Sequence, residues 1–274
     1  MKVIKITAIF LLAILASAFA ASPAAAAASD GKRVKVKIGV SSELAKELWA
    51  PVVKRAADDG IDIELITFGD YTIPNEALNA GEIDLNAFQH HTFLNNEIKS
   101  KGYKIVSIAD TFFTPMSVYS RKIKTIKELK AGDKIAVPND VVNLGRALTV
   151  LQGAKIIKLD PNAGLTPELN DITENPLKIE IVQLSAEQVP ALLPDVAAGL
   201  INVGHARDFG LSPSKDGIFQ DNASLYKDNG YVNLIAARIE DAENEVYKRV
   251  VKAYQTDEQK KFFESYGGFY IPAW

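Results

Sequence analysis

An arginine stands just inside a predicted helix that follows a predicted strand. The segment 136–146 reads Ala-Val-Pro-Asn-Asp-Val-Val-Asn-Leu-Gly-Arg and contains Asn143 and Arg146. Free backbone N–H groups at a helix start favour a bound anion, and an arginine can grip a carboxylate through two parallel hydrogen bonds. The alternative interpretation is that Asn143 only caps the helix and that Arg146 pairs with a surface acid.

A second polar segment, residues 84–93, also follows a predicted strand. It contains Phe88, His90, His91 and Phe93. Ligands of open α/β sheets bind at the carboxyl ends of the strands, so both segments lie where a ligand cleft is expected. His90 is therefore a candidate ligand contact, although a single histidine at such a place more often has a structural hydrogen-bonding role.

The sequence shows no assembled set of catalytic residues. His90 and His91 are adjacent, so their side chains point in different directions and are poorly placed to share one metal ion. The His-Glu-x-x-His spacing, the Gly-x-Ser-x-Gly elbow and the phosphate-binding loop motif are all absent. We therefore expect a protein that is not an enzyme and that needs no metal or cofactor.

The first residues have the layout of a secretory signal peptide. Lys2 and Lys5 precede an apolar run, which is followed by small residues with candidate cleavage sites after Ala20 and Ala28. The run is shorter than the roughly 20 apolar residues of a membrane span. We expect residues 1–28 to be the signal peptide and leader, although cleavage after Ala20 is an alternative.

The amino-acid composition limits the cellular compartments and the kinds of partner that can be expected for this protein. The chain has no cysteine, which excludes disulfides, thiolate nucleophiles and a lipid anchor on an N-terminal cysteine. Together with the signal peptide, this predicts a protein that diffuses freely in a bacterial periplasm. The net charge of −3 offers no basic face, so no nucleic-acid partner is expected.

Runs rich in valine and isoleucine alternate with segments of helical spacing, which indicates an α/β protein with a mainly parallel sheet. The predicted strands cover residues 34–40, 61–68, 83–87, 134–137, 179–184 and 200–202, with extended segments at 105–119 and 231–238. The predicted helices cover residues 41–58, 74–80, 91–101, 126–130, 144–151, 186–198, 242–254 and 258–265. Ser41 or Ser42 stands where the N-cap of the first of these helices is expected.

Two successive series of strands and helices suggest two lobes. The chain would cross between them near Tyr119 and Tyr231, with the last helices returning to the first lobe. Residues 29–118 with 232–274 would form lobe 1, and residues 119–231 would form lobe 2. A monomer is the default expectation.

Several phrases of the sequence occur together in one known family. They are Thr-Phe-Gly-Asp-Tyr at 67–71, Pro-Asn-Glu-Ala-Leu at 74–78, Asn-Ala-Phe-Gln-His at 86–90, Asn-Leu-Gly-Arg-Ala-Leu at 143–148, Leu-Ser-Pro at 211–213, Tyr-Val-Asn-Leu-Ile at 231–235 and Ile-Pro-Ala-Trp at 271–274. In this order they resemble the methionine-binding proteins of ABC importers, the MetQ/NlpA-type family. The resemblance covers nearly the whole chain after the leader.

The resemblance implies a type II periplasmic-binding-protein fold with a hinge and a ligand cleft between the lobes. It also implies delivery of methionine, or of a closely related amino acid or short peptide, to a membrane permease and its ATPase. Transferred position by position, the expected ligand-binding residues are Tyr71, Phe88, His90, Phe93, Asn143, Arg146, Asn202, His205 and Asn233. Aromatic residues would surround the thioether side chain, and Arg146 would grip the carboxylate.

Three departures from the family pattern fall at the expected ligand face. Phe93 stands where the family usually has a tyrosine, and Gly204 and His205 replace part of an aromatic wall. These changes could enlarge or polarise the pocket, so a related amino acid, a short peptide or a methionine derivative is an alternative ligand. From another functional class, an exported hydrolase acting on a small amino-acid-like substrate is the alternative.

Overall fold

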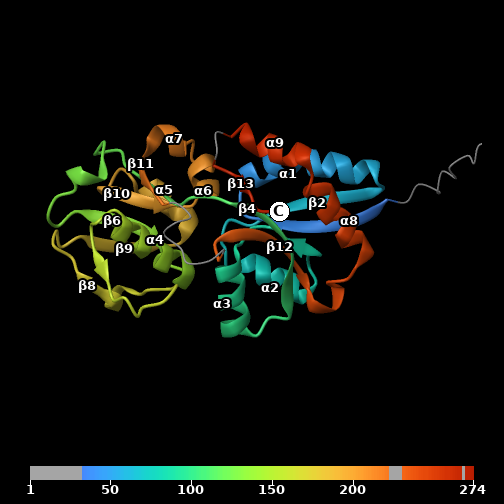
Figure 1. Ribbon diagram of the computed structural model, residues 1–274, viewed down its shortest axis with the longest axis horizontal. Coiled ribbons are helices and arrows are strands. Elements are labelled where there is room, and N and C mark those ends of the chain that lie inside the picture. Colours follow the sequence, from blue (N-terminus) through green and yellow to red (C-terminus); the bar gives the residue numbers. More distant parts are fainter. Residues whose placement is uncertain (1–32, 222–229, 267–268) are drawn as a thin grey trace, which may run out of the picture. The chain divides into compact units, whose positions relative to one another are not determined.

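The computed structural model describes residues 33–221, 230–266 and 269–274 (Figure 1). The predicted signal peptide lies outside these residues. Within the described part of the chain, no helix is both long enough and apolar enough to cross a membrane.

The first sheet has six strands in the order β13-β4-β12-β3-β1-β2. Its strands are β1 (Val34–Val40), β2 (Ile61–Thr67), β3 (Leu85–Asn86), β4 (Ile105–Phe113), β12 (Val232–Arg238) and β13 (Ile271–Pro272). Strand β1 pairs in parallel with β2 and β3, whereas β12 and β13 pair antiparallel with β4. The sheet is therefore mixed, and the prediction of a mainly parallel sheet is wrong for this half.

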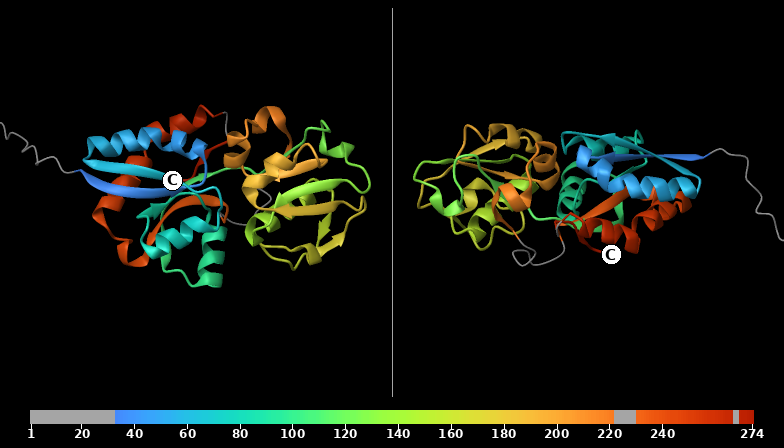
Figure 2. Two further views of the ribbon diagram at one scale, coloured as in Figure 1. Left: turned by 180° about the vertical axis from the view of Figure 1, so that it is seen from behind. Right: turned by 90° about the horizontal axis from the view of Figure 1, so that it is seen from above.

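Helices cover both faces of the six-stranded sheet (Figures 1 and 2). They are α1 (Glu43–Asp58), α2 (Ile73–Ala80), α3 (His91–Lys101), α8 (Glu245–Tyr254) and α9 (Asp257–Glu264). Helices α1, α8 and α9 pack with Ile235 and Ala237 in one apolar cluster, whereas α2 and α3 pack with Leu234 and Ala236 in another. Successive side chains of a strand point to opposite faces, so β12 contributes to both cores.

The second sheet has five strands in the order β11-β5-β10-β6-β9. Its strands are β5 (Ser117–Tyr119), β6 (Lys134–Pro138), β9 (Glu180–Leu184), β10 (Ala198–Ile201) and β11 (Gly217–Gln220). Strand β6 pairs in parallel with β9 and β10, and β5 pairs antiparallel with β10 and β11.

The five-stranded sheet also has a core on each face. Helix α4 (Val141–Gly153) packs with Ile135 and Val137 on one face, and α5 (Val189–Leu192) packs with Ala136 on the other. The remaining elements are α6 (Val203–Asp208), α7 (Pro213–Asp216), the antiparallel pair β7 (Lys158–Leu159) and β8 (Ile172–Glu174), and the 3-10 helices η1 (Ile126–Glu128), η2 (Leu169–Asp171), η3 (Ala186–Gln188) and η5 (Ile239–Asp241).

The chain passes from the first sheet to the second between β4 and β5, where the extended segment predicted at 105–119 is interrupted. Pro115 lies in this connection and cannot donate a ladder hydrogen bond, which explains why the segment forms two strands in different sheets. The chain returns to the first sheet at β12. The lobe boundaries at 118/119 and 231/232 stay a prediction, and β5 spans the first of them.

The helix predicted over residues 186–198 is wrong. The structure has η3 followed by the single turn of α5, then irregular backbone up to β10. Pro194 has no backbone N–H to continue the helical ladder, so an apolar stretch that looks helical ends early. The helix predicted over 91–101, in contrast, is present with the same bounds as α3.

A buried cluster of three amide side chains holds the segment that leads from β3 to α3. Asn75 Nδ2 donates to Gln89 Oε1 at 2.8 Å, and Asn75 Oδ1 accepts from Gln89 Nε2 at 2.6 Å and from Asn86 Nδ2 at 2.9 Å. All three side chains are at most 2% exposed. The cluster fixes the backbone on which Phe88 and His90 stand.

Asn75→Ala is expected to lower the free energy of unfolding by about 2–3 kcal/mol, because it removes three buried hydrogen bonds and leaves the buried Gln89 Oε1 without its donor. Urea unfolding followed by circular dichroism measures this loss. The control is Asn95→Ala on the exposed face of α3, expected to change stability by less than about 0.5 kcal/mol. Equal losses in both variants would contradict the structural role of the cluster.

Candidate functional site

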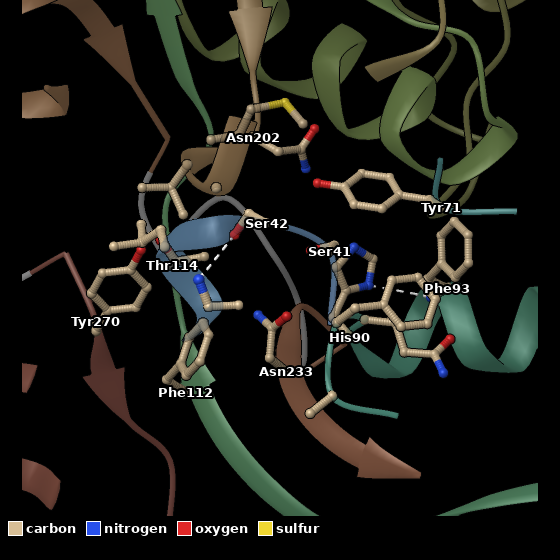
Figure 3. Close-up of a pocket in the computed structure, with 18 of the residues that line it drawn as sticks. Ser41, Ser42, Tyr71, His90, Phe93, Phe112, Thr114, Asn202, Asn233 and Tyr270 are labelled. Atoms are coloured by element: carbon tan, nitrogen blue, oxygen red, sulfur yellow. Dashed lines mark hydrogen bonds between the residues drawn. The ribbon is translucent and has the colours of Figure 1, made fainter. Parts of the chain in front are cut away.

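One pocket lies where elements of the two sheets meet, and it has about 740 Å³ of empty space including its open mouth (Figure 3). Most of its lining residues are apolar or uncharged polar. They are Ser41, Ser42, Leu44, Ala45, Leu48, Tyr71, Ala87, Phe88, Gln89, His90, Phe93, Phe112, Thr114, Pro115, Met116, Asn143, Arg146, Asn202, Val203, Gly204, Asn233 and Tyr270.

Three of the predicted aromatic residues form one wall of this pocket. The ring of Tyr71 lies 6.0 Å from that of Phe88 and 6.3 Å from that of Phe93, and Phe88 and Phe93 make an edge contact at 5.7 Å. Tyr71 comes from the turn before α2, and Phe93 from the first turn of α3. Figure 3 shows the hydroxyl end of Tyr71 directed toward Asn202. Burial raises the pKa of Tyr71, so the hydroxyl stays protonated.

His205 is not among the residues that line the pocket. It is buried in α6, and its ring packs on that of Tyr71 with the centroids 4.9 Å apart. Its Nε2 atom is buried and has no hydrogen-bond partner among the described residues. Burial lowers the pKa of His205, so the ring is neutral. The structure therefore places His205 behind the aromatic wall.

Gly204 lies on the pocket side of the same helix, yet it opens no extra space. A Cβ atom at this position would lie 3.0 Å from Ser42 Oγ and 3.2 Å from Ser42 Cβ, so Ser42 fills the room that a side chain would take. The expectation that Gly204 enlarges the pocket is not what the packing shows.

His90 is the N-cap residue of helix α3, and one of its ring nitrogens faces the start of that helix. Its Nδ1 atom accepts a hydrogen bond from the backbone N–H of Phe93 at 3.2 Å, so the proton of the neutral ring is on Nε2. Burial, and next the positive charge of Arg146, lower the pKa of His90 well below its usual value. His90 therefore offers the pocket a neutral donor, while its neighbour His91 binds Asp110 at 2.6 Å.

The start of α4 is capped by the chain's own carboxylate. Asp140 accepts from the backbone N–H of Asn143 at 2.9 Å and from the Asn143 side chain at 3.0 and 3.1 Å. Burial raises the pKa of Asp140. The interpretation of Asn143 as the helix cap is therefore wrong, because Asp140 is the cap and occupies the position that was predicted for a bound anion.

Asn143 in turn orients Asn202, which stands just before α6. Asn202 Nδ2 donates to Asn143 Oδ1 at 3.0 Å. The other polar atom of this side chain, Asn202 Oδ1, is buried and has no hydrogen-bond partner within the described part of the chain. An unsatisfied buried acceptor in a pocket is unfavourable unless a ligand supplies the donor.

Arg146 lines the pocket, but its guanidinium is held by a buried acid of the protein. Nε and Nη2 of Arg146 both lie 3.0 Å from Asp221 Oδ2, and Nη2 donates to the Thr114 carbonyl at 2.8 Å. Arg146 and Asp221 are only 2% and 1% exposed. The Arg146 cation also lies 4.6 Å from the centre of the Tyr231 ring. Arg146 is thus paired with an interior acid, Asp221, and the alternative interpretation that it pairs with a surface acid is wrong.

Asn233 extends into the pocket from β12 (Figure 3). Its backbone forms an isolated bridge with His90, which brings the two polar side chains to the same part of the pocket. Among the described residues, its side-chain amide has no hydrogen-bond partner.

The structure adds lining residues that sequence reasoning missed, among them Ser42, Thr114 and Tyr270. Ser42 Oγ caps α1 by accepting from the backbone N–H of Ala45 at 3.1 Å. Thr114 lies in the connection between the sheets, and its Oγ1 is buried without a partner in residues 33–221, 230–266 and 269–274. Only Ser42 carried a signal in the sequence, as a helix cap. Among the described residues, no cluster of histidine and acidic side chains is arranged to hold a metal ion.

Comparisons with known proteins show which proteins this chain is similar to. Residues 36–274 match the family described as NlpA lipoprotein. The chain is 46% identical over 233 residues to the D-methionine-binding lipoprotein MetQ of Salmonella typhimurium, which covers 84% of this chain and 83% of that protein.

Two solved structures are also similar. A nutrient binding protein from Burkholderia cenocepacia bound to methionine has a TM-score of 0.82 and 40% identity, covering 87% of this chain and 100% of that chain. An ABC transporter periplasmic substrate-binding protein from Coxiella burnetii has a TM-score of 0.81 and 37% identity, covering the same shares. The predicted periplasmic-binding-protein fold is thereby confirmed.

The comparisons contradict the predicted localisation, a freely diffusing periplasmic protein without a lipid anchor. The matching family and the Salmonella relative are both named as lipoproteins. The prediction rested on the lack of cysteine in the chain. An absent residue type does not establish where a protein resides, and this is why the inference failed.

Asp221→Ala is expected to lower the free energy of unfolding by about 3 kcal/mol or more, because it leaves the buried charge of Arg146 without its anion. Urea unfolding measures the loss. Asp195→Ala replaces an exposed acid in the same half of the protein and is the control. A loss no greater than that of the control would show that Arg146 does not depend on Asp221.

Lowering the pH from about 7.5 to 5.5 is expected to reduce the free energy of unfolding. His90 and His205 have lowered pKa values when folded, whereas the same residues titrate near pH 6.5 when unfolded, so the unfolded state binds more protons below that pH. The stability that comes from keeping these two rings neutral is fully present above about pH 6.5 and is lost as the pH falls below that value. Each histidine lowers the free energy of unfolding by at most about 1.4 kcal/mol per pH unit.

Urea unfolding at several pH values tests this expectation. The double variant His90→Asn, His205→Phe should lose less stability over this range than the unsubstituted protein, and the asparagine introduced in place of His90 can still cap α3. His91→Asn leaves both buried histidines in place and should retain the pH dependence. An equal loss in the double variant and the unsubstituted protein would contradict the assignment.

Proposed function

We propose, from the premise that the chain belongs to the NlpA lipoprotein family, that it is the solute-binding protein of an ABC importer and captures methionine. The observation that carries the proposal is a pocket in which buried polar groups lie beside an aromatic wall. The relatives are named for binding methionine or for serving an ABC transporter.

The polar part of the pocket suits a zwitterion. Arg146 and Asp221 together carry no net charge, and the lowered pKa of His90 keeps that ring neutral. A ligand with one positive and one negative group can therefore enter without leaving a buried charge unmatched. We assign the ligand's ammonium group to Asn202 Oδ1, which lacks a donor among the described residues, and its carboxylate to the region of Arg146, His90 and Asn233.

Because Nε and Nη2 of Arg146 already bind Asp221, we assign Arg146 the role of a fixed positive charge near the carboxylate. Asn143 acts through Asn202, whose amide it orients. Direct hydrogen bonds to the carboxylate would come from the Nε2 proton of His90 and from the amide of Asn233.

The apolar part of the pocket suits a thioether side chain. Tyr71, Phe88 and Phe93 present their faces and edges within a few ångströms of one another. Sulfur contacts with aromatic rings contribute about 0.3–1.5 kcal/mol each. His205 would support this wall from behind by packing on Tyr71. Phe93 offers no hydroxyl, so the side-chain end of the ligand should carry no polar group.

The pocket draws its lining from elements of both sheets, which fits a hinged protein. In our proposal, residues 29–118 with 232–274 form one lobe, residues 119–231 form the other, and the ligand stabilises the closed form because it touches both. A membrane permease and its ATPase would receive the ligand from a monomeric binding protein.

The relatives are binding proteins and not enzymes, which bears out the prediction that this chain is not an enzyme. The exported hydrolase is therefore set aside. Another amino acid, a short peptide or a methionine derivative remains the alternative ligand, and the panel below includes all three.

L-Methionine or D-methionine is expected to raise the melting temperature of protein that has been unfolded and refolded to remove any bound ligand. At a free ligand concentration about 100 times Kd, linkage predicts roughly 2.7 kcal/mol of stabilisation. Leucine, methionine sulfoxide and a methionine dipeptide complete the panel. A shift with one of these and none with methionine would overturn methionine as the ligand.

Asn233→Ala is expected to raise the Kd for methionine about 10- to 100-fold in calorimetric titrations, since a hydrogen bond to a charged group contributes about 1.5–3 kcal/mol. The side chain has no other hydrogen bond among the described residues, so folding should be intact. Asn95→Ala on the exposed face of α3 is the control and should bind normally. Unchanged affinity in Asn233→Ala would remove this residue from the site.

A further inference from the structure

An acid outside the pocket joins the two halves of the protein. Asp208, the last residue of α6, accepts from the backbone N–H groups of Glu43 at 3.1 Å and of Leu44 at 3.2 Å. These N–H groups belong to the first turn of α1, which packs on the six-stranded sheet, whereas α6 packs with the five-stranded sheet. The contact spans about 165 positions of the chain.

The contact completes the cap of helix α1. Ser42 already binds the backbone N–H of Ala45, so Asp208 takes two of the N–H groups that remain at the helix start. A carboxylate is well suited to this position, because the start of a helix carries a partial positive charge. Asp208 therefore makes a favourable contact only while α6 lies against α1.

Gly204 shows how close the two helices are. A Cβ atom at position 204 would lie 3.0 Å from Ser42 Oγ, tighter than most side-chain contacts in proteins. Ser42, Leu44 and Gly204 also line the pocket, so the meeting point of α1 and α6 forms part of its wall. Contact between the helices and enclosure of the ligand therefore occur together.

We propose that Asp208 is a positioning residue for ligand binding, which holds α6 on the start of α1 and so slows release of the ligand. The inference rests on the proposed function, because it assumes that the protein opens to release its ligand. In an open form, water would replace the contact on both sides. Asp208 would then stabilise the closed form alone and shift the equilibrium toward it without touching the ligand.

The test compares Asp208→Ala, Asp208→Asn and the control Asp195→Ala, an exposed acid of the same half whose side chain has no hydrogen bond among the described residues. Release of radiolabelled methionine into excess unlabelled methionine is followed in time. Asp208→Ala is expected to release about three- to fivefold faster, in line with the loss of a helix cap at an exposed position. Asp208→Asn should show a smaller increase, because it retains an acceptor.

A second variant disturbs the contact between α1 and α6 at Gly204 instead of at Asp208. Gly204→Ala should also release methionine faster, since the added methyl group pushes α6 away from Ser42. The melting temperature of the ligand-free protein separates this role from an ordinary structural one. It should be the same in Asp208→Ala and in the unsubstituted protein, because the contact belongs to the closed form.

Faster release with an unchanged ligand-free melting temperature supports the inference. Release at the unsubstituted rate from Asp208→Ala would overturn it while leaving the proposed function in place. A fall in the ligand-free melting temperature as large as that in the presence of methionine would also overturn it, because Asp208 would then cap α1 in every form. Lack of methionine binding by the unsubstituted protein would overturn the proposed function and the inference together.

Discussion

The buried pair of Arg146 and Asp221 is the interaction on which the centre of this protein depends. Helix α4 carries a guanidinium into the interior, where an unmatched charge would be strongly destabilising. Asp221 matches it and also accepts from the backbone N–H of Met116 at 2.8 Å, while the Thr114 carbonyl accepts from Arg146. The pair therefore ties α4, the connection between the sheets and the end of β11 to one point beside the pocket.

Most polar side chains in the pocket are held by another part of the protein. Phe93 fixes the ring of His90 through its backbone, Asp140 fixes Asn143, and Asn143 fixes Asn202. Groups held in this way lose little conformational freedom when a ligand arrives, which favours affinity. Among the buried atoms of the pocket, Asn202 Oδ1 and Thr114 Oγ1 have no hydrogen-bond partner in the described residues, and Asn202 Oδ1 can only accept, so a ligand there must donate to it.

Gly204 and His205, which were expected to shape the pocket directly, have structural roles beyond the ligand. Gly204 allows α6 to approach Ser42, and His205 packs behind Tyr71 instead of lining the pocket. Both residues act on the position of other groups.

The sequence by itself determined those helices and helix caps that depend on residues only a few positions apart. Helix α3 lies over the predicted residues, and Ser42 caps α1 as expected, because apolar spacing and capping act within a few residues. Tyr71, Phe88, His90 and Asn233 lie in the family phrases, and the structure places all four in the lining of one pocket. Where the pattern was ambiguous, as over residues 186–198, proline ended the helix early.

Tertiary structure alone decided which groups far apart in the sequence pair with one another through hydrogen bonds and ion pairs. The acid that holds Arg146 is 75 positions away, and the acid that caps α1 is about 165 positions away. Neither pairing has a sequence signature, since periodicity reports which face of an element is buried but not which distant element covers it. These contacts follow from how two mixed sheets and their crossing segments pack, because a buried charge or a helix end takes whichever partner the packing brings within hydrogen-bonding distance.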